Sequence, residues 1–253
     1  QYGQTRQAGR FASIEGVGTA SPELRPRQDV GAEIDWRAPG IEKPTPAAGE
    51  TQTAILAGVR VLDLSNVIAG PAAGRTLAEF GAEVIRIDHP APLAGPRMTM
   101  WFGLDVNQGK RATILDLKSK DGRAAFARLV ESADVVLHNF LDRSAETLGI
   151  SHDQLAAINP DITSCQISAW GGPDGGPLKD DPAFDPVLQA ATGIMSRFGS
   201  PETPVMHAVA SCVDYITGFT ATLGIAQALL ARDLGRGGAA VRCSIAENFT
   251  DRD

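Results

Sequence analysis

The sequence predicts an α/β protein with a Rossmann-like, open and mainly parallel sheet flanked by helices. Two observations support this prediction. From Ile55 onward, short apolar runs alternate with segments whose apolar residues recur at helical spacing. The 253 residues are 43% hydrophobic and 21% charged, as in globular proteins, and a chain of this length can bury a sizeable core. Strands that alternate with helices favour a parallel sheet covered on both faces.

The first elements follow one another closely. The run VRVLDL (59–64) predicts a buried strand, and EVIRID (83–88) predicts a second. Between them, GRTLAEFGA (74–82) predicts a helix that Gly81 ends. RATILDL (111–117) is strand-like and has Ile114 and Leu115 at its centre.

The alternation continues to the end of the chain. Ser119 is placed to cap a helix whose apolar face is formed by Phe126, Leu129, Val130 and Ala133. The remaining predicted elements are a strand at 134–140, short helices in SAETLG and HDQLAAI, a strand at 161–170, one helix over PVLQAATGIMSRF, a long helix from Asp214 that its glycines stop, and a last strand in AAVRCSIAE.

Residues 1–54 differ in composition from the rest. They are rich in Pro, Gly, Arg, Glu and Thr and have no sustained period, which is typical of a linker or an extended tail. Ile34, Trp36 and Ile41 are their candidate anchors. We therefore divide the chain into a tail at 1–54 and one α/β domain at 55–253.

Charge and composition argue against several classes of protein. A net charge of −7 disfavours broad nucleic-acid binding, although a local cluster of Lys and Arg can still hold one anionic ligand. We expect no membrane span, no secretory signal and a cytoplasmic location. Cys165, Cys212 and Cys243 are odd in number and widely spaced, so we expect reduced thiols and no metal site.

The stretch from Gly58 to His89 has the outline of a dinucleotide-binding unit, but its turn does not fit NAD. A Rossmann turn needs G-x-G-x-x-G, whereas this turn offers Gly70 and Gly74 as G-x-x-x-G. Pro71 lacks the N–H that a phosphate would accept from. Asp88 has the spacing of a ribose-binding acid, which is a weak signal alone.

Three blocks of the sequence together resemble the family III CoA-transferases: RVLDLSNVIAGPAAGRTLAEFGAEVIRID, GKRATILDLKSKDGRAAFARLVESADVVLHNF and SAWGGPDGGPLKDDPAFDPVLQAATGIM. They come in the order of the family's own blocks, and the match runs from about Gly58 to Phe249. The resemblance implies a Rossmann-like large domain that binds coenzyme A as a substrate instead of NAD. It also implies acyl-CoA and carboxylic acid substrates and a homodimer of interlocked chains.

The resemblance assigns the nucleophile to Asp214, in VMHAVASCVDYITGFTATLG. A carboxylate can attack an acyl-CoA thioester to give an anhydride and then an enzyme-bound thioester. A helix N-terminus would favour the ionised carboxylate and bring N–H groups to developing oxyanions. The alternative is that Asp214 is only the N-cap of the helix.

The resemblance also assigns positions that contact CoA. Lys110, Arg111 and Lys118 bracket a strand and offer charges for its phosphates, although solvated surface lysines are an equal alternative. The candidate CoA-binding residues are Val67, Ala69, His89, Leu115, Lys118, Asn139, Phe140 and Arg143.

Some positions depart from the family pattern. Asn66 stands where His is frequent, Ile68 where Gln occurs, and His89 and Thr147 where Arg is usual. Arg143, one turn before Thr147, can supply the charge. These departures concern the phosphate contacts more than the fold.

One departure separates transfer from racemisation. A racemase of this group needs a His–Asp pair, and Phe184 occupies the His position while Asp185 is retained to polarise the site. His207 lies seven residues before Asp214, and no motif supports it as a replacement. CoA transfer is therefore favoured, with racemisation, transfer followed by elimination, and a non-catalytic half of a tandem enzyme as alternatives.

The family continues past AAVRCSIAE into a small domain with a glycine-rich loop, and we expect this small domain to be missing here. The opening QYGQTRQAGRF resembles the tail of a family member. We therefore expect a fragment from the junction of two fused copies, which would pair as a pseudo-dimer.

Overall fold

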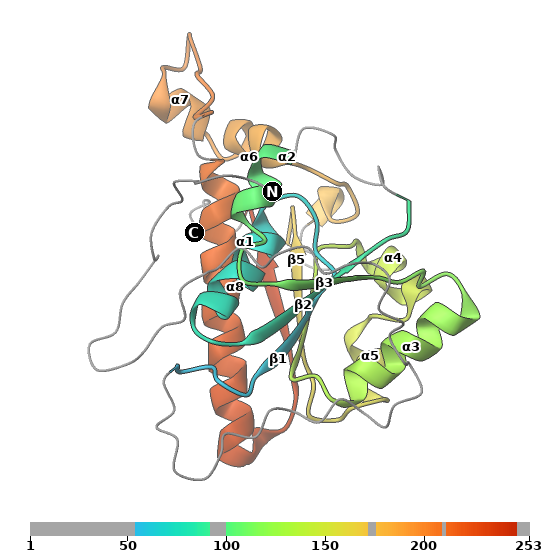
Figure 1. Cartoon of the computed structure of the whole chain (residues 1–253). Coiled ribbons are helices and arrows are strands. Elements are labelled where there is room, and N and C mark those ends of the chain that lie inside the picture. The colour runs from blue at the N-terminus through green and yellow to red at the C-terminus, as the bar shows by residue number, and fades with distance from the viewer. Residues whose placement is uncertain (1–53, 92–99, 172–175, 209–210, 247–253) are drawn as a thin grey trace, which may run out of the picture.

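The computed structural model describes residues 54–91, 100–171, 176–208 and 211–246 (Figure 1). Within them six strands form one sheet in the order β3-β2-β1-β4-β5-β6. All neighbouring strands run parallel, which confirms the predicted mainly parallel sheet. The described sheet is in fact entirely parallel. The strands are β1 (Arg60–Asp63), β2 (Glu83–Asp88), β3 (Arg111–Ile114), β4 (Val135–His138), β5 (Thr163–Ser168) and β6 (Ala239–Ser244).

Helices cover both faces of the sheet. Helices α1 and α8 lie on one face, and α3, α4 and α5 lie on the other (Figure 1). The helices are α1 (Ala69–Glu79), α2 (Met100–Asp105), α3 (Lys120–Glu131), α4 (Asp142–Leu148), α5 (His152–Ala156), α6 (Asp185–Ala191), α7 (Ile194–Phe198) and α8 (Cys212–Ala231). The order of the strands reverses between β1 and β4, which is where open α/β sheets bind ligands.

Alternate residues of the central strands fill two separate cores. Val135 and Leu137 of β4 pack with α1 and α8, whereas Val136 packs with α3, α4 and α5. This alternation follows from the two-residue period of a strand. The two faces are buried, so the central strands are apolar on both sides.

Helix α1 begins at Ala69, five residues before the predicted start. The prediction treated AGPAAG as a turn because glycine and proline usually interrupt helices. Pro71 lies in the first helical turn, where its missing N–H removes no intrahelical bond. Gly81, at φ +99°, follows the last turn of α1, where a glycine was predicted to end the helix.

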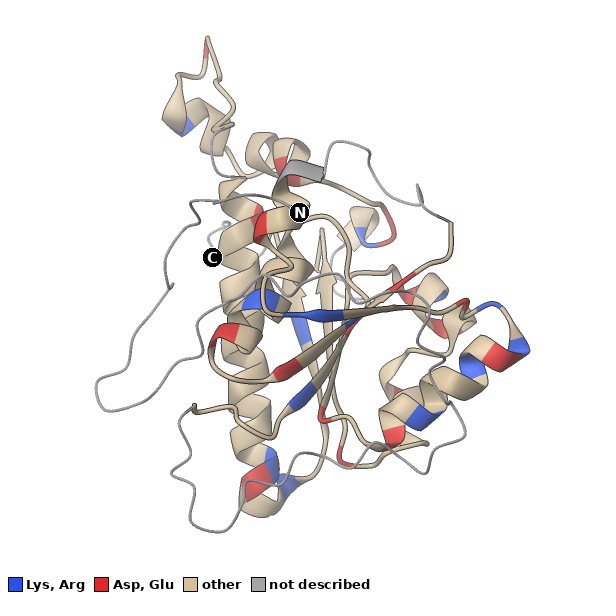
Figure 2. Cartoon of the chain, in the orientation of Figure 1, with Lys and Arg blue, Asp and Glu red and all other residues tan. Residues whose placement is uncertain are grey.

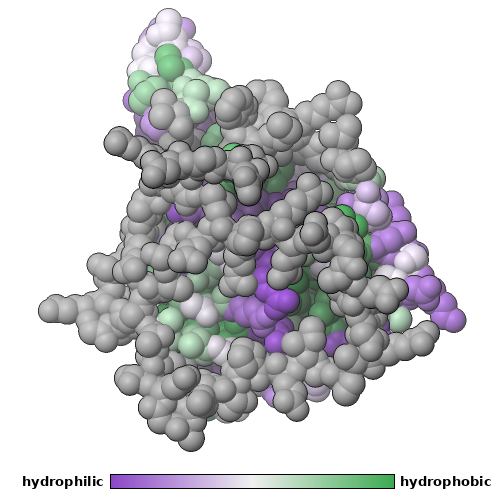
Figure 3. All heavy atoms as spheres, viewed as in Figure 1, coloured by the Kyte–Doolittle hydropathy of each residue, from purple (hydrophilic) through white to green (hydrophobic). Residues whose placement is uncertain are grey.

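The single helix predicted over PVLQAATGIMSRF is wrong, because the structure divides it into α6 and α7. Gly193 adopts φ +75°, in the left-handed region, and separates the two helices. The α7 segment projects from the body of the protein (Figure 1), and Figure 3 shows pale and apolar colours on this projection. Phe198, Val205 and Met206 are exposed there.

Helix α8 is the long helix predicted near the end of the chain, and it starts two residues before Asp214. It is almost free of charge along its length (Figure 2), and Asp214 is its single charged residue. By length and composition, Cys212–Arg236 could cross a membrane, but α8 packs on α1, β5 and β6 as a core helix does. A π-helical turn at Arg232–Arg236 follows, with Gly235 in the left-handed region.

The other predictions agree within a few residues. Ser119 caps α3 by accepting a hydrogen bond from the N–H of Gly122 at 2.9 Å, which confirms its predicted role. Helix α2 and a short 3-10 turn at Gly176–Leu178 had no prediction. The cysteines are thiols, and Cys165 and Cys243 are buried. The predictions for residues 1–53 lie outside the described residues, as does the middle of the GGPDGGPLKDDP loop.

Candidate active site

A cavity of about 380 Å³ opens at the carboxyl edge of the sheet, beside Asp214. We call it the acid cavity. It is bounded by the turn after β1, the segment after β4, the end of β5 and the segment before α6. Its lining residues are Asn66, Val67, Ala69, Asn139, Phe140, Leu141, Ser144, Ile167, Ser168, Ala169, Asp181, Pro182, Ala183, Phe184, Asp214 and Ile245.

A second cavity of about 560 Å³ adjoins the first, and we call it the basic cavity. The two share Asn66, Phe140 and Ser144 as lining residues. The basic cavity lies over the ends of β1, β2 and β3 and one side of α4. It is lined by Leu64, Asn66, Ile87, Asp88, His89, Leu115, Leu117, Lys118, Phe140, Arg143, Ser144, Thr147 and Leu148.

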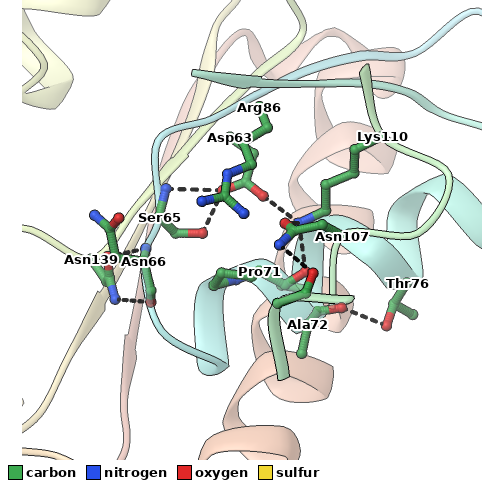
Figure 4. Close-up of polar contacts among 12 residues, drawn as sticks. Asp63, Ser65, Asn66, Pro71, Ala72, Thr76, Arg86, Asn107, Lys110 and Asn139 are labelled. Atoms are coloured by element: carbon green, nitrogen blue, oxygen red, sulfur yellow. Dashed lines mark hydrogen bonds and ion pairs between the residues drawn. The ribbon is translucent and has the colours of Figure 1, made fainter. Parts of the chain in front are cut away.

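The turn after β1 forms a wall of both cavities and is held from two sides. Asn139 accepts a hydrogen bond from the N–H of Asn66 at 2.9 Å and donates its Nδ2 to the carbonyl of Asn66 at 2.8 Å (Figure 4). Val67 adopts φ +72°, which is costly for a β-branched residue. The strained turn therefore depends on the surrounding contacts, and Asn139 positions it.

A buried ion pair holds the turn from the other side (Figure 4). Lys110 Nζ donates to Asp63 Oδ2 at 2.7 Å and to the carbonyl of Pro71 at 2.8 Å. The other oxygen of Asp63 accepts from the N–H and the hydroxyl of Ser65. Burial lowers the pKa of Lys110, and the adjacent Asp63 carboxylate opposes this shift.

This pair corrects the prediction for Lys110. Its side chain is buried between β1 and α1 and lines neither cavity, so it is not available to a phosphate. Arg111 lies outside the cavities as well and forms an ion pair with Glu83 at 2.7 Å.

The close packing also explains the two glycines of the turn. A Cβ on Gly70 would collide with Ser65, and one on Gly74 would lie 2.5 Å from Asp63 Oδ2. The two glycines of the G-x-x-x-G spacing therefore allow α1 to pack closely against Ser65 and against the Asp63–Lys110 ion pair.

Asp214 is the third residue of α8 and is not its N-cap, which excludes that alternative. Ser211 holds the cap position in a left-handed conformation and makes no side-chain cap bond. Asp214 is 5% exposed. Burial, and then the negative charge of Asp185, raise the pKa of Asp214 to about 7.

Asp185 lies behind Asp214 and does not line either cavity. Its Oδ2 accepts hydrogen bonds from the N–H groups of Val213 at 3.2 Å and Asp214 at 3.4 Å. Its Oδ1 accepts from Gln189, whose side chain also bonds the backbone of His207. Burial raises the pKa of Asp185, although these hydrogen bonds oppose the shift.

The arrangement of Asp185 corrects one expectation. The N–H groups that begin α8 are directed to Asp185, so they are not available to an oxyanion as the sequence suggested. Helix α1 has no side-chain cap, and its first residue, Ala69, lines the acid cavity. The positive end of the α1 dipole therefore faces the cavity instead.

The structure brings nine of the ten predicted site residues to the two cavities. The acid cavity contains Val67, Ala69, Asn139, Phe140 and Asp214, and the basic cavity contains His89, Leu115, Lys118, Phe140 and Arg143. Asp185 is the exception. Contact with the cavities does not test the predicted binding roles, which stay predictions.

Sequence reasoning missed several lining residues and dismissed one. Ser144 lies on both cavities and Asp181 on the acid cavity, and neither stands in a pattern that signals a site. Asp88 lines the basic cavity and forms an ion pair with Arg86 at 2.7 Å. Its position at the end of β2 was the available signal.

Neither cavity resembles a metal centre. Across residues 54–91, 100–171, 176–208 and 211–246, no group of three His, Cys, Asp or Glu side chains is arranged to hold a metal ion. The charged groups of the acid cavity in these ranges are Asp181 and Asp214. The basic cavity carries Lys118 and Arg143, the imidazole of His89, and the carboxylate of Asp88, which is paired with Arg86. The site thus joins a buried carboxylate to a cavity suited to anionic groups.

Comparison with known proteins agrees with this chemistry. The sequence profile of a family described as CoA-transferase family III matches residues 56–251. The "CoA-transferase/lyase DddD" of Marinomonas sp. is 36% identical over 241 residues. A "Succinate--glutarate CoA-transferase" of Agrobacterium fabrum is 33% identical over 189 residues. A crystal structure of Rv3272 from M. tuberculosis superposes with a TM-score of 0.70 at 31% identity, covering 77% of this chain and 54% of that one.

The chain spans only part of these relatives. It matches over 90% of its own length but 28% of the Marinomonas protein, and over 69% of its length but 47% of the Agrobacterium protein.

Proposed function

The chain belongs to CoA-transferase family III, and we propose that it transfers CoA from an acyl-CoA donor to a carboxylic acid, with Asp214 as the nucleophile. One observation carries the proposal. A buried carboxylate with a raised pKa lies on a cavity that adjoins a second, cation-bearing cavity at the switch point of the sheet.

The reaction would proceed through two covalent states of Asp214. Its carboxylate attacks the thioester carbonyl and the C–S bond breaks, so that CoA leaves as a thiolate and a mixed anhydride of Asp214 and the donor acid is formed. The thiolate then attacks the aspartyl carbonyl, which releases the donor acid and leaves an aspartyl-CoA thioester. The acceptor carboxylate repeats the first step, and the returning thiolate takes the new acyl group and frees Asp214.

The surroundings of Asp214 favour this chemistry. A desolvated carboxylate is a stronger nucleophile than a hydrated one, and its pKa near 7 leaves a large ionised fraction at neutral pH. The N-terminus of α1 at Ala69 supports negative charge on the attacked carbonyl oxygen.

We propose that CoA occupies the basic cavity, with its thiol end toward Asp214. Lys118, Arg143 and His89 offer donors for the 3′-phosphate and pyrophosphate. Leu115 and Phe140 offer apolar contact for the adenine or the pantetheine chain. Phe140 lies on both cavities, so a chain passing it would run from one cavity to the other.

A second candidate, transfer followed by elimination, is favoured by the name of the 36% identical Marinomonas relative, a CoA-transferase/lyase. Racemisation is disfavoured, because Phe184 lines the acid cavity, is 47% exposed and carries no transferable proton.

The assembly and the location are also proposals. Following the family resemblance, we propose an interlocked dimer or a pseudo-dimer of fused copies. We propose that the parent acts in the cytoplasm.

The test uses the full-length protein with short acyl-CoA donors and acids, starting with succinyl-CoA and glutarate because one relative's name contains both acids. Mass spectrometry of the CoA thioesters should detect acceptor-CoA, and Asp214→Asn should abolish it. Incorporation of deuterium at the α-carbon of a branched acyl-CoA, without transfer, would establish racemisation instead. An unsaturated product acid would favour the lyase.

A further inference from the structure

The residue after the proposed nucleophile connects it to two other elements. Tyr215 follows Asp214 in the first turn of α8, and its hydroxyl donates to Asp105 Oδ2 at 2.8 Å. Asp105 ends α2, and its Oδ1 accepts a hydrogen bond from Nη1 of Arg75, in α1, at 2.7 Å. A single carboxylate thus links the start of α8 to α1.

Apolar packing follows the same route. Ile68, Ala72 and Val106 form a small buried cluster, separate from the two main cores, and Val67, Phe102 and Tyr215 pack against it. We call this the α2 cluster. It joins the strained turn after β1 to the residue beside Asp214.

Side chains from two other elements hydrogen-bond to the first turn of α8. Ser211 supplies no side-chain cap, and the two hydrogen bonds from the turn to Asp185 are 3.2 and 3.4 Å long. The Tyr215 hydroxyl bond is the second such link, and Val213, one residue before Asp214, is buried in the core that α1 and α8 share. Helix ends fray unless contacts hold them, so the Tyr215–Asp105 bond helps to set the position of the turn.

The Tyr215 hydroxyl stays a donor across the physiological range. Burial, with the hydrogen bond and negative charge of Asp105, raises the pKa of Tyr215 further above its ordinary value. Asp105 is also held by Arg75, which in turn is fixed by Glu79 at 2.9 Å. The Asp105 carboxylate is therefore fixed by α1, independently of its hydrogen bond with Tyr215.

We propose that Tyr215 and Asp105 are positioning residues, which hold the Asp214 carboxylate in register with the turn that carries Val67 and Ala69. Neither side chain lines the acid cavity or the basic cavity, so they act through Asp214 and not on the substrate. The inference rests on the proposed role of Asp214. Attack on a thioester needs the reacting atoms about 3–3.5 Å apart, and a displacement of about 1 Å can cost up to about 100-fold in rate.

The experiment measures exchange of labelled succinate into succinyl-CoA by the full-length protein. Tyr215→Phe removes one hydroxyl, and we expect kcat to fall roughly tenfold while the KM for succinyl-CoA stays within about twofold. Thr220→Ala is the matched control, because it removes another α8 hydroxyl, which donates within its own helix to the carbonyl of Ile216. It should leave kcat unchanged.

The same Tyr215→Phe substitution, made in an Asp105→Ala protein, separates a positioning role from a general loss of stability. In Asp105→Ala the acceptor is gone, so Tyr215→Phe should cause no further loss of kcat. An equal loss in both backgrounds would overturn the inference, as would a Tyr215→Phe protein with unchanged kcat. Should Asp105→Ala fail to fold, the split between kcat and KM in Tyr215→Phe decides alone.

The two proposals fail differently. Full exchange activity in Asp214→Asn would overturn the proposed function, and the positioning role with it. An inactive Asp214→Asn beside a fully active Tyr215→Phe would overturn only the positioning role.

Discussion

Two buried carboxylates meet at the start of α8: Asp214 belongs to this helix, and Asp185 is the first residue of α6. Asp214 lines the acid cavity, whereas Asp185 accepts backbone N–H groups behind it. The charge of Asp185 is the second cause, after burial, of the raised pKa of Asp214. Asp185 therefore affects the nucleophile through its charge as well as through the helix it holds.

This arrangement predicts a shift in the pH profile of Asp185→Asn. Asparagine keeps an acceptor oxygen for the α8 N–H groups but loses the charge, so the pKa of Asp214 should fall from about 7. Because the carboxylate form is the nucleophile, activity rises with pH through this pKa. The acid limb of kcat/KM should therefore move to lower pH.

Asp181→Asn is the control for that profile, because Asp181 lines the acid cavity but is not a cause of the Asp214 shift. Its acid limb should stay in place. A limb that does not move in Asp185→Asn, or moves to higher pH, would contradict the electrostatic account.

Lys118 is the residue whose role in CoA binding can be tested most simply. It is exposed and lies on the basic cavity, so Lys118→Ala should weaken CoA binding about 3- to 10-fold and reduce its salt dependence. Titration calorimetry with CoA measures both effects. Lys120→Ala removes the same charge two residues away, outside the cavity, and should bind CoA normally. An equal loss of CoA affinity in the two variants would show that the effect comes from net charge and not from a contact between Lys118 and CoA.

At the scale of residues, nine of the ten predicted site residues line the two cavities, and their roles stay predictions. Lys110 was expected either to meet a phosphate or to be solvated, and both expectations were wrong because its side chain is buried. A sequence does not state whether a lysine is solvated or buried. The partner of Lys110 is Asp63, 47 residues earlier, and the pair forms only when β1 and the segment before β3 come together. Long-range pairs of this kind lie beyond local patterns.

At the scale of elements, α1 and the buried pair beneath it form one unit. Gly74→Ala should place a methyl group against Asp63 and Lys110 and lower the free energy of unfolding by about 2–4 kcal/mol. Gly103→Ala, in α2, meets nothing within 4 Å and should change it by less than about 1 kcal/mol. Urea unfolding measures both. Equal stability of the two variants would show that α1 can move away from the pair.

The elements that sequence patterns predicted best are those that periodicity and caps define together. The strand EVIRID matches β2 residue for residue, and Ser119 caps α3 as expected. The predicted start of α1 and the single helix predicted in place of α6 and α7 were wrong for the same reason. Glycine can either permit a helix or end it, and the packing of Gly70 and the positive φ of Gly193 decide which.

At the scale of the whole molecule, the alternation of strands and helices predicted a parallel sheet but not the order of its strands. The order β3-β2-β1-β4-β5-β6 depends on contacts between distant segments, and it places the switch point between β1 and β4. Both cavities lie at that edge, where the helices of the two faces diverge. The common position of the predicted residues is thus a consequence of topology.

The central claim is that Asp214 becomes covalently acylated. The most direct measurement incubates the full-length protein with its acyl-CoA donor, adds hydroxylamine and maps the modified peptide by mass spectrometry. The account predicts a hydroxamate at Asp214 that requires the acyl-CoA and is absent from Asp214→Asn. Transfer activity without any modification of Asp214, or with modification at another carboxylate, would contradict it.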